Sequence, residues 1–161
     1  MTNEPRLNLP RIAHAVRHDA NNALMVLHVN IDMLSRGATS DAAQRQAARA
    51  EEARARLEAL LHALLATLGR TPGVIEALAP QRVVEDALPL LRAVLGARNP
   101  VVVEGAPTAS ASIDRAGLEA WLLATACDAD QQNAMLRLVF EGQALHAIIP
   151  DNETKIFLLT P

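Results

Sequence analysis

Residues 9–36 read LPRIAHAVRHDANNALMVLHVNIDMLSR, and the prediction of the fold begins from this segment. Its apolar residues recur at steps of three and four, the spacing that places them on one face of an α-helix. This apolar face consists of Ile12, Val16, Ala20, Ala23, Leu24, Leu27, Ile31 and Leu34. Pro10 falls in the first turn, where a missing N–H is tolerated, and Gly37 follows the last turn as a stop. We therefore predict one long helix over residues 9–36.

A second long helix is predicted over residues 41–68, which contain no Gly and no Pro. Ser40 precedes this segment as a helix cap. Its apolar stripe consists of Ala50, Leu57, Leu60, Leu61, Leu64 and Leu68. Two antiparallel helices bury only one stripe each against one another, so the remaining apolar surface needs a further partner. A homodimeric four-helix bundle supplies that partner most simply.

The composition excludes several classes of function. The chain has 161 residues, of which 50% are hydrophobic and 2% aromatic, and its net charge is −3. Few aromatic residues and a mildly acidic balance argue against a nucleic-acid partner. The single Cys127 excludes an internal disulfide and a cysteine zinc site. No apolar run reaches the ~18 residues of a membrane span, and residues 1–10 have no signal-peptide core. We expect a cytoplasmic protein without a membrane partner.

The distribution of charge divides the chain into two parts. Residues 1–70 carry nine Lys or Arg and seven Asp or Glu, a net charge of +2, whereas residues 71–161 carry six and eleven, a net charge of −5. The segment GRTPG, residues 69–73, has the Gly and Pro of a linker. We therefore predict a helical-hairpin domain over residues 1–70 and a second domain over residues 71–161.

The second domain reads as a small α/β layer. Helices are predicted over residues 81–96, with a kink at Pro89, and over residues 114–129, with Asp114 as cap. Strands are predicted over residues 101–104, 111–113, 135–140, 144–149 and 155–159. The fold class is α+β, with a long helical hairpin followed by a small α/β sandwich.

A polar face of the first helix carries the candidate chemistry. At about 100° per residue, His18 falls almost opposite Leu27, the centre of the apolar face. His18 shares its face with Arg11, His14, Asn22, Met25 and Asp32. His14 and His18 have the spacing of a metal pair but lack a third ligand in a known motif, so no metal is expected. The simplest alternative is that both histidines are ordinary solvated side chains.

The run VRHDANNALMVL, residues 16–27, resembles the phosphoacceptor helix of histidine kinases, in the subset that reads His-Asp-x-Asn-Asn-x-Leu. Residues 56–70, RLEALLHALLATLGR, resemble the end of the dimerisation hairpin of that family. The resemblance implies that His18 is phosphorylated and that Asp19 orients and tunes its imidazole. It also implies that Asn22 positions a water in members that dephosphorylate their partners.

The second domain is similar to the ATP-binding domain that follows this hairpin in histidine kinases, through residues 79–91 and 118–129. The two asparagines of the family's nucleotide site align with Trp121 and Thr125, and the Asp-x-Gly-x-Gly loop, the lid and the later glycines are absent. The chain therefore resembles a dimeric histidine phosphotransferase, built like a histidine kinase with a degenerate ATPase-like domain. No cofactor is expected in this chain.

The resemblance implies that His18 relays a phosphoryl group between receiver-domain aspartates in a bacterial two-component phosphorelay, without ATP-dependent autophosphorylation. The expected partners are response-regulator receiver domains, which carry the Mg²⁺, and a hybrid histidine kinase. The expected docking face consists of Arg11, His14, Arg17, Asn21 and Met25. Two alternatives remain. One is a dimeric adaptor that binds or sequesters a receiver or kinase, and the other is a receiver phosphatase that uses Asn22.

Overall fold

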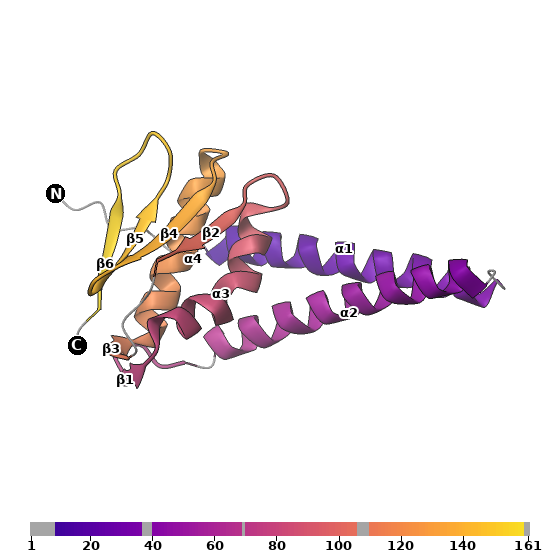
Figure 1. Cartoon of the computed structure of the whole chain (residues 1–161), viewed down its shortest axis with the longest axis horizontal. Coiled ribbons are helices and arrows are strands. Elements are labelled where there is room, and N and C mark those ends of the chain that lie inside the picture. Colours follow the sequence, from indigo (N-terminus) through magenta and orange to yellow (C-terminus); the bar gives the residue numbers. More distant parts are fainter. Residues whose placement is uncertain (1–8, 37–39, 69, 106–109, 160–161) are drawn as a thin grey trace.

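Two long helices project as an arm from an α/β part (Figure 1). This computed structural model describes residues 9–36, 40–68, 70–105 and 110–159. The fold class is α+β, as the sequence predicts. Gly37, the expected stop of the first helix, and Gly69, the first residue of the expected linker, lie outside the described residues. Most of residues 1–10, where no signal-peptide core is expected, also lies outside them.

The arm consists of α1 (Leu9–Ser35) and α2 (Ser40–Leu68), which run antiparallel and pack against each other. The predicted ends of both helices lie within one residue of the observed ends. Small and medium apolar side chains fill the seam between them, which lets the two backbones approach closely. The buried seam residues are Val16, Ala23, Ala53, Leu60 and Ala63. Ser40, predicted as the residue before the second helix, is its first residue.

The α/β part is built on a four-stranded sheet with the order β2-β4-β5-β6. Its strands are β2 (Val101–Glu104), β4 (Leu136–Glu141), β5 (Ala144–Ile148) and β6 (Lys155–Leu158). β2 pairs with β4 in parallel, and the other two pairs are antiparallel. Alternate side chains of β4 and β5 are fully or almost fully buried, which is the period-2 pattern of a sheet with one covered face. Helices cover that face, namely α3 (Pro80–Leu95) and α4 (Arg115–Gln131).

The sequence pattern does not predict one of the strands. β1 (Ile75–Leu78) pairs antiparallel with β3 (Ala111–Asp114), in register from Ile75–Asp114 to Leu78–Ala111. Three of the four β1 residues are exposed, so the segment lacks the alternation by which a half-buried strand is recognised. Its hydrogen-bonding partner lies more than thirty residues later in the chain, and only the tertiary structure brings the two together.

The predicted ends of the other elements are close to the observed ones. Asp114 caps α4 as predicted, because its side chain accepts a hydrogen bond of 3.0 Å from the Gly117 N–H. α3 begins at Pro80 and continues through Pro89 to Leu95. Cys127 is buried, as its place on an apolar helix indicates.

The base of the hairpin packs on the α/β part. Ile12 and Val16 of α1 and Leu60 of α2 belong to the same buried cluster as α3 and α4. Polar contacts also cross this junction, where Arg11 of α1 bonds Asp130 of α4 and Arg70 bonds Glu119 of α4. One continuous core therefore fixes the hairpin to the second part.

No helix within the described ranges is long and apolar enough to cross a membrane.

Candidate functional site

His18 lies near the base of the arm, in the third turn of α1, with its side chain exposed. The apolar seam residues Val16 and Ala23 turn the opposite side of the helix toward α2. The helix thus holds the imidazole on the outward face of a rigid element that is packed along its other side. A second molecule can reach this ring without any rearrangement of the arm.

Asn22 contacts the imidazole from one helical turn further along. Its carboxamide nitrogen lies 3.2 Å from His18 Nδ1, the i, i+4 spacing at which helix side chains meet. When the amide N–H donates to Nδ1, the proton of the neutral ring lies on Nε2. A half-turn of the carboxamide instead lets its oxygen accept from Nδ1–H, which leaves the lone pair on Nε2. Asn22 can therefore hold the ring in either neutral tautomer.

Asp19 directs its carboxylate to the neighbouring helix. It forms an ion pair with Arg56 of α2, in which Arg56 Nε donates to Asp19 Oδ2 over 3.2 Å and Nη2 donates to Oδ1. The Asp19 side chain is only 13% exposed, whereas that of Arg56 is 61% exposed. The residue next to His18 in sequence is thus tied to α2, and the imidazole instead contacts Asn22.

The predicted docking residues lie in two different environments, one at the junction with the second part and one on the exposed surface of α1. Arg11 bonds Asp130 of the second part, with Nε 3.0 Å from Oδ2, and its side chain is 35% exposed. The remaining docking residues are exposed on α1, namely His14, Arg17, Asn21 and Met25, with Arg17 and Met25 on either side of the imidazole along the chain. Met25 is 61% exposed and lies seven residues beyond His18, on the same stripe of the helix. Arg11 therefore joins the two parts of the chain, and the other four lie on the outer surface of the arm.

Two residues near the site do not emerge from the sequence pattern. Arg56 reaches Asp19 from the other helix, and no signal in the sequence fixes the register between α1 and α2 that brings them together. Val29 is 46% exposed and continues the outward stripe one turn after Met25. Its spacing of four residues from Met25 is the signal that could have identified it.

Within the described part of the chain, no three His, Cys, Asp or Glu side chains are grouped so that they could hold a metal ion. Trp121 and Thr125 lie on α4. Thr125 is fully buried and donates its hydroxyl hydrogen to the Trp121 carbonyl over 2.8 Å. The Trp121 ring lies 5.6 Å from that of Phe157 on β6.

The arrangement offers an exposed imidazole on a rigid helix, an amide that can fix its tautomer, and an apolar and polar surface around it. An imidazole nitrogen held in this way is a competent nucleophile near neutral pH. Comparison of the chain with known protein families and with curated protein sequences found no match to either.

Proposed function

We propose that this protein is a histidine phosphotransfer protein, in which His18 relays a phosphoryl group between the aspartates of receiver domains. The observation that carries the proposal is the exposed His18 imidazole, held by Asn22 on the outward face of α1. The resemblance of residues 16–27 to the phosphoacceptor helix of histidine kinases suggests that the reaction is phosphoryl transfer. The relay belongs to a bacterial two-component pathway in the cytoplasm, with a hybrid histidine kinase as a further partner.

The reaction needs few protein groups. His18 Nε2 attacks the phosphorus of an aspartyl phosphate on the partner, an N–P bond forms, and the acyl O–P bond breaks. The electron pair of that bond stays on the partner's carboxylate. The proton stays on Nδ1, which donates a hydrogen bond to the Asn22 oxygen once the carboxamide has made a half-turn. Such transfers depend mainly on alignment of the reacting atoms and on charge neutralisation. A Mg²⁺ ion held by the receiver domain would supply the neutralisation.

The outward face of α1 provides the docking surface. Next to His18 it carries the cation Arg17 and the amide Asn21, which suit the acidic rim of a loaded receiver site. Further along, Met25 and Val29 add exposed apolar area of the kind that anchors protein interfaces. His18, Met25 and Val29 lie on the side of α1 away from α2, whereas Arg17 lies on a neighbouring stripe, seven residues before Leu24.

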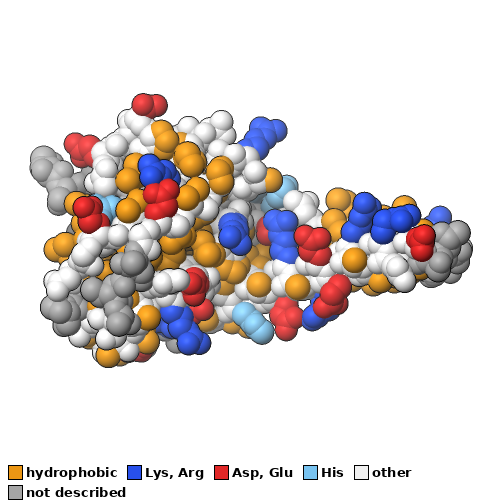
Figure 2. All heavy atoms as spheres, in the orientation of Figure 1, with side chains coloured by type: hydrophobic (Ala, Val, Ile, Leu, Met, Phe, Trp, Pro, Cys, Tyr) orange, Lys and Arg blue, Asp and Glu red, His pale blue; other side chains and the backbone are white. Residues whose placement is uncertain are grey.

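We further propose that the arm forms a four-helix bundle with the arm of a second copy. Beside the seam, α1 exposes Leu24 and Ile31, which are 50% and 52% exposed. α2 exposes Leu61 and Leu68, which are 45% and 69% exposed. At about 100° per residue, both sets flank the seam on the same side of the hairpin. Hydrophobic side chains interrupt the charged ones along the surface of the arm in Figure 2.

The sizes of these residues support a second copy as the occupant. In the outer half of the arm, α1 carries the large residues and α2 offers the small Ala43 and Ala50. Nearer the base the order reverses, because Leu61 of α2 lies about level with Ala13 of α1 when the helices are aligned on the Asp19–Arg56 pair. A two-fold axis along the arm sets α1 of one copy against α2 of the other. Large side chains then meet small ones across the interface.

The second part supports a protein that does not phosphorylate itself with ATP. The two α4 positions that align with nucleotide-site asparagines are Trp121 and Thr125, and the Thr125 hydroxyl is used by the helix backbone. We propose that this part is a degenerate histidine-kinase ATPase-like domain, without a cofactor, that braces the base of the hairpin.

To test the relay, the protein is mixed with a receiver domain whose aspartyl phosphate carries a radioactive label. Label is expected to move to this chain in a form that is stable to alkali and labile to acid, and then to a second receiver. The variant His18→Gln is expected to stay folded, because the side chain is exposed, and to take up no label. Label on the His18→Gln variant would reject His18 as the acceptor.

A second candidate uses the same face differently. Asn22 is exposed beside His18, where its carboxamide could hold a water for hydrolysis of a partner's aspartyl phosphate. A receiver phosphatase would release inorganic phosphate without labelling this chain, and Asn22→Ala would abolish the release. Receiver binding that is unchanged in His18→Gln, with neither label nor phosphate release, would instead indicate an adaptor.

A further inference from the structure

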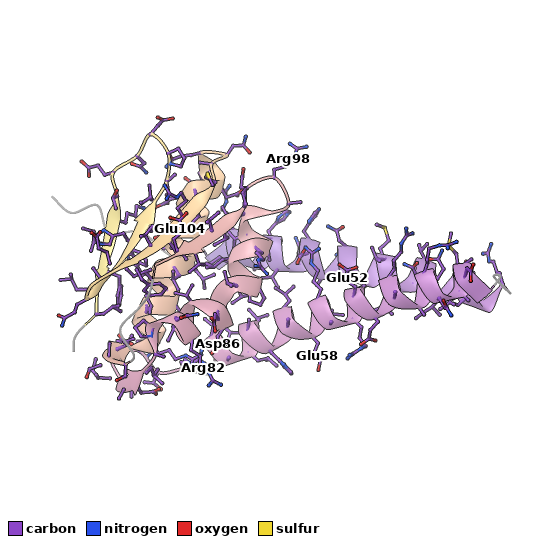
Figure 3. All side chains as sticks on the ribbon, viewed as in Figure 1. Glu52, Glu58, Arg82, Asp86, Arg98 and Glu104 are labelled. Carbon is purple, nitrogen blue, oxygen red and sulfur yellow. The ribbon has the colours of Figure 1, made fainter. Side chains whose placement is uncertain are left out.

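A cavity of about 340 Å³ lies at the junction between the arm and the second part, and His18 is not among the residues that line it. It is formed where the end of α2 faces α3 and α4, and Asp86 of α3 is labelled in this region in Figure 3. One wall consists of small apolar groups, namely Ala59, Ala63 and Ala66 of α2 and Pro89 of α3. The polar lining consists of His62, Thr67, Arg70, Glu85, Asp86 and Glu119. Its volume is that of a site for a small molecule.

Glu119 is the unusual member of this lining. It is 2% exposed, and one of its oxygens, Oε1, accepts hydrogen bonds from Arg70 Nη1 over 2.5 Å and from Arg115 Nε over 3.1 Å. The other oxygen, Oε2, is buried and has no hydrogen-bond partner. An unpaired oxygen of a buried carboxylate is costly, because the group has lost its water and gained nothing in return. Glu119 Oε2 therefore still needs a hydrogen-bond donor.

The charges around the cavity favour a ligand that donates hydrogen bonds and also carries a positive charge. Glu85, Asp86 and Glu119 contribute three carboxylates, whereas Arg70 and Arg115 contribute two guanidinium groups. Arg115 is shared between Glu119 and Asp86, with Nη2 2.5 Å from Asp86 Oδ2. Burial acts to lower the pKa of Arg115, but the hydrogen bonds to both carboxylates raise it above its usual value. The carboxylates of this cluster thus outnumber its guanidinium groups by one.

We propose that this cavity binds a small aliphatic cation, an amine or a guanidine, whose N–H groups bond Glu119 and Asp86 and whose hydrocarbon stem lies against the alanines of α2. A neutral molecule of the same shape would satisfy the orphan oxygen but not the charge. The ligand would touch α2 on one side and α3 and α4 on the other, so its binding also stabilises the junction between the arm and the second part. This inference does not depend on phosphotransfer by His18.

The test is calorimetric titration of the full chain with n-butylguanidinium and n-butylammonium, with n-butylurea as the neutral probe of the same shape. Saturable binding of one cation per chain is expected, together with a rise in melting temperature, and the urea should bind more weakly by at least about tenfold. Absence of saturable binding for both cations, or equal binding of the urea, would overturn the proposal.

Three variants locate the site. Glu119→Gln is expected to weaken binding by roughly tenfold to a hundredfold, the loss typical of one hydrogen bond to a charged group. Ala66→Leu fills the cavity while every charge remains, so it tests the site even if the Glu119 variant folds poorly. Glu52→Gln removes an equal charge from the exposed arm and should leave binding unchanged. Unaltered binding in Ala66→Leu, or equal weakening in Glu52→Gln, would place the cation on the surface and reject the cavity.

Discussion

Asp19 of α1 and Arg56 of α2 form an ion pair that joins the two helices of the arm one residue away from His18. The carboxylate is largely buried and the guanidinium is largely exposed. This contact adds to the apolar seam in holding α1 against α2, with His18 and Asn22 exposed on α1. Asp19 thus helps to hold in place the helix that carries the imidazole.

This ion pair should contribute measurably to stability. Asp19→Asn and Arg56→Ala are each expected to lower the free energy of unfolding by about 0.5–1 kcal/mol, which is typical of a partly exposed pair. For a chain of this size that corresponds to a fall in melting temperature of roughly 1–4 °C. The double variant should lose less than the sum of the two single variants, as urea denaturation can measure. Strictly additive losses would mean that the pair contributes no coupling.

His18 should be essential for transfer and dispensable for folding. His18→Gln is expected to keep its circular dichroism spectrum and melting temperature, since the side chain is exposed, and to lose all phosphoryl transfer. His28 provides the matched control, because it is also exposed on α1 but faces another direction. His28→Gln should transfer the phosphoryl group at the wild-type rate. A strong loss in the His28 variant would indicate general damage to the helix.

Asn22 should set the rate through the orientation of the imidazole. Asn22→Ala removes the contact with Nδ1 and is expected to slow labelling of His18 by about tenfold to a hundredfold, the value of a positioned hydrogen bond. Rapid-quench measurement of the labelling rate, with receiver affinity measured separately, distinguishes orientation from docking. An unchanged labelling rate would remove Asn22 from the mechanism.

The proposed bundle predicts which apolar residues a charge will disrupt. Ile31→Glu introduces a carboxylate into the face that we assign to the second copy, so the variant is expected to be monomeric in analytical ultracentrifugation. Met33→Glu is the matched control, because Met33 is 46% exposed against 52% for Ile31 and lies on the other side of the same helix. Met33→Glu should leave the oligomeric state unchanged. A dimeric Ile31→Glu variant would exclude this face.

Gly105 should be less replaceable than Gly142. It has a φ of +89°, and an added Cβ would collide with the Phe140 carbonyl oxygen on β4. Gly142 also has a positive φ, +57°, but an added Cβ would meet nothing within 4 Å. We expect Gly142→Ala to lower the free energy of unfolding by about 1–2 kcal/mol, from backbone strain alone. Gly105→Ala should lower it by more, and equal losses in urea titrations would mean that the collision is relieved.

Much of the fold follows from local pattern. The 3.6-residue spacing of apolar side chains identifies both helices of the arm, and period-2 alternation identifies β4 and β5. The exposed face of His18 follows from the same helical spacing. Strand β1 cannot be predicted from local pattern, since three of its four residues are exposed and its strand partner is remote in sequence.

Local sequence sets which residues share a face of one helix, because the helical period is a property of the local backbone. That period alone groups His18, Asn22 and Met25 on one side of α1, where the structure places them. Contacts between elements come instead from the tertiary structure, since they depend on the register and rotation of packed helices. It paired Asp19 with Arg56, joined Arg11 to Asp130, and enclosed Glu119 with one oxygen unsatisfied.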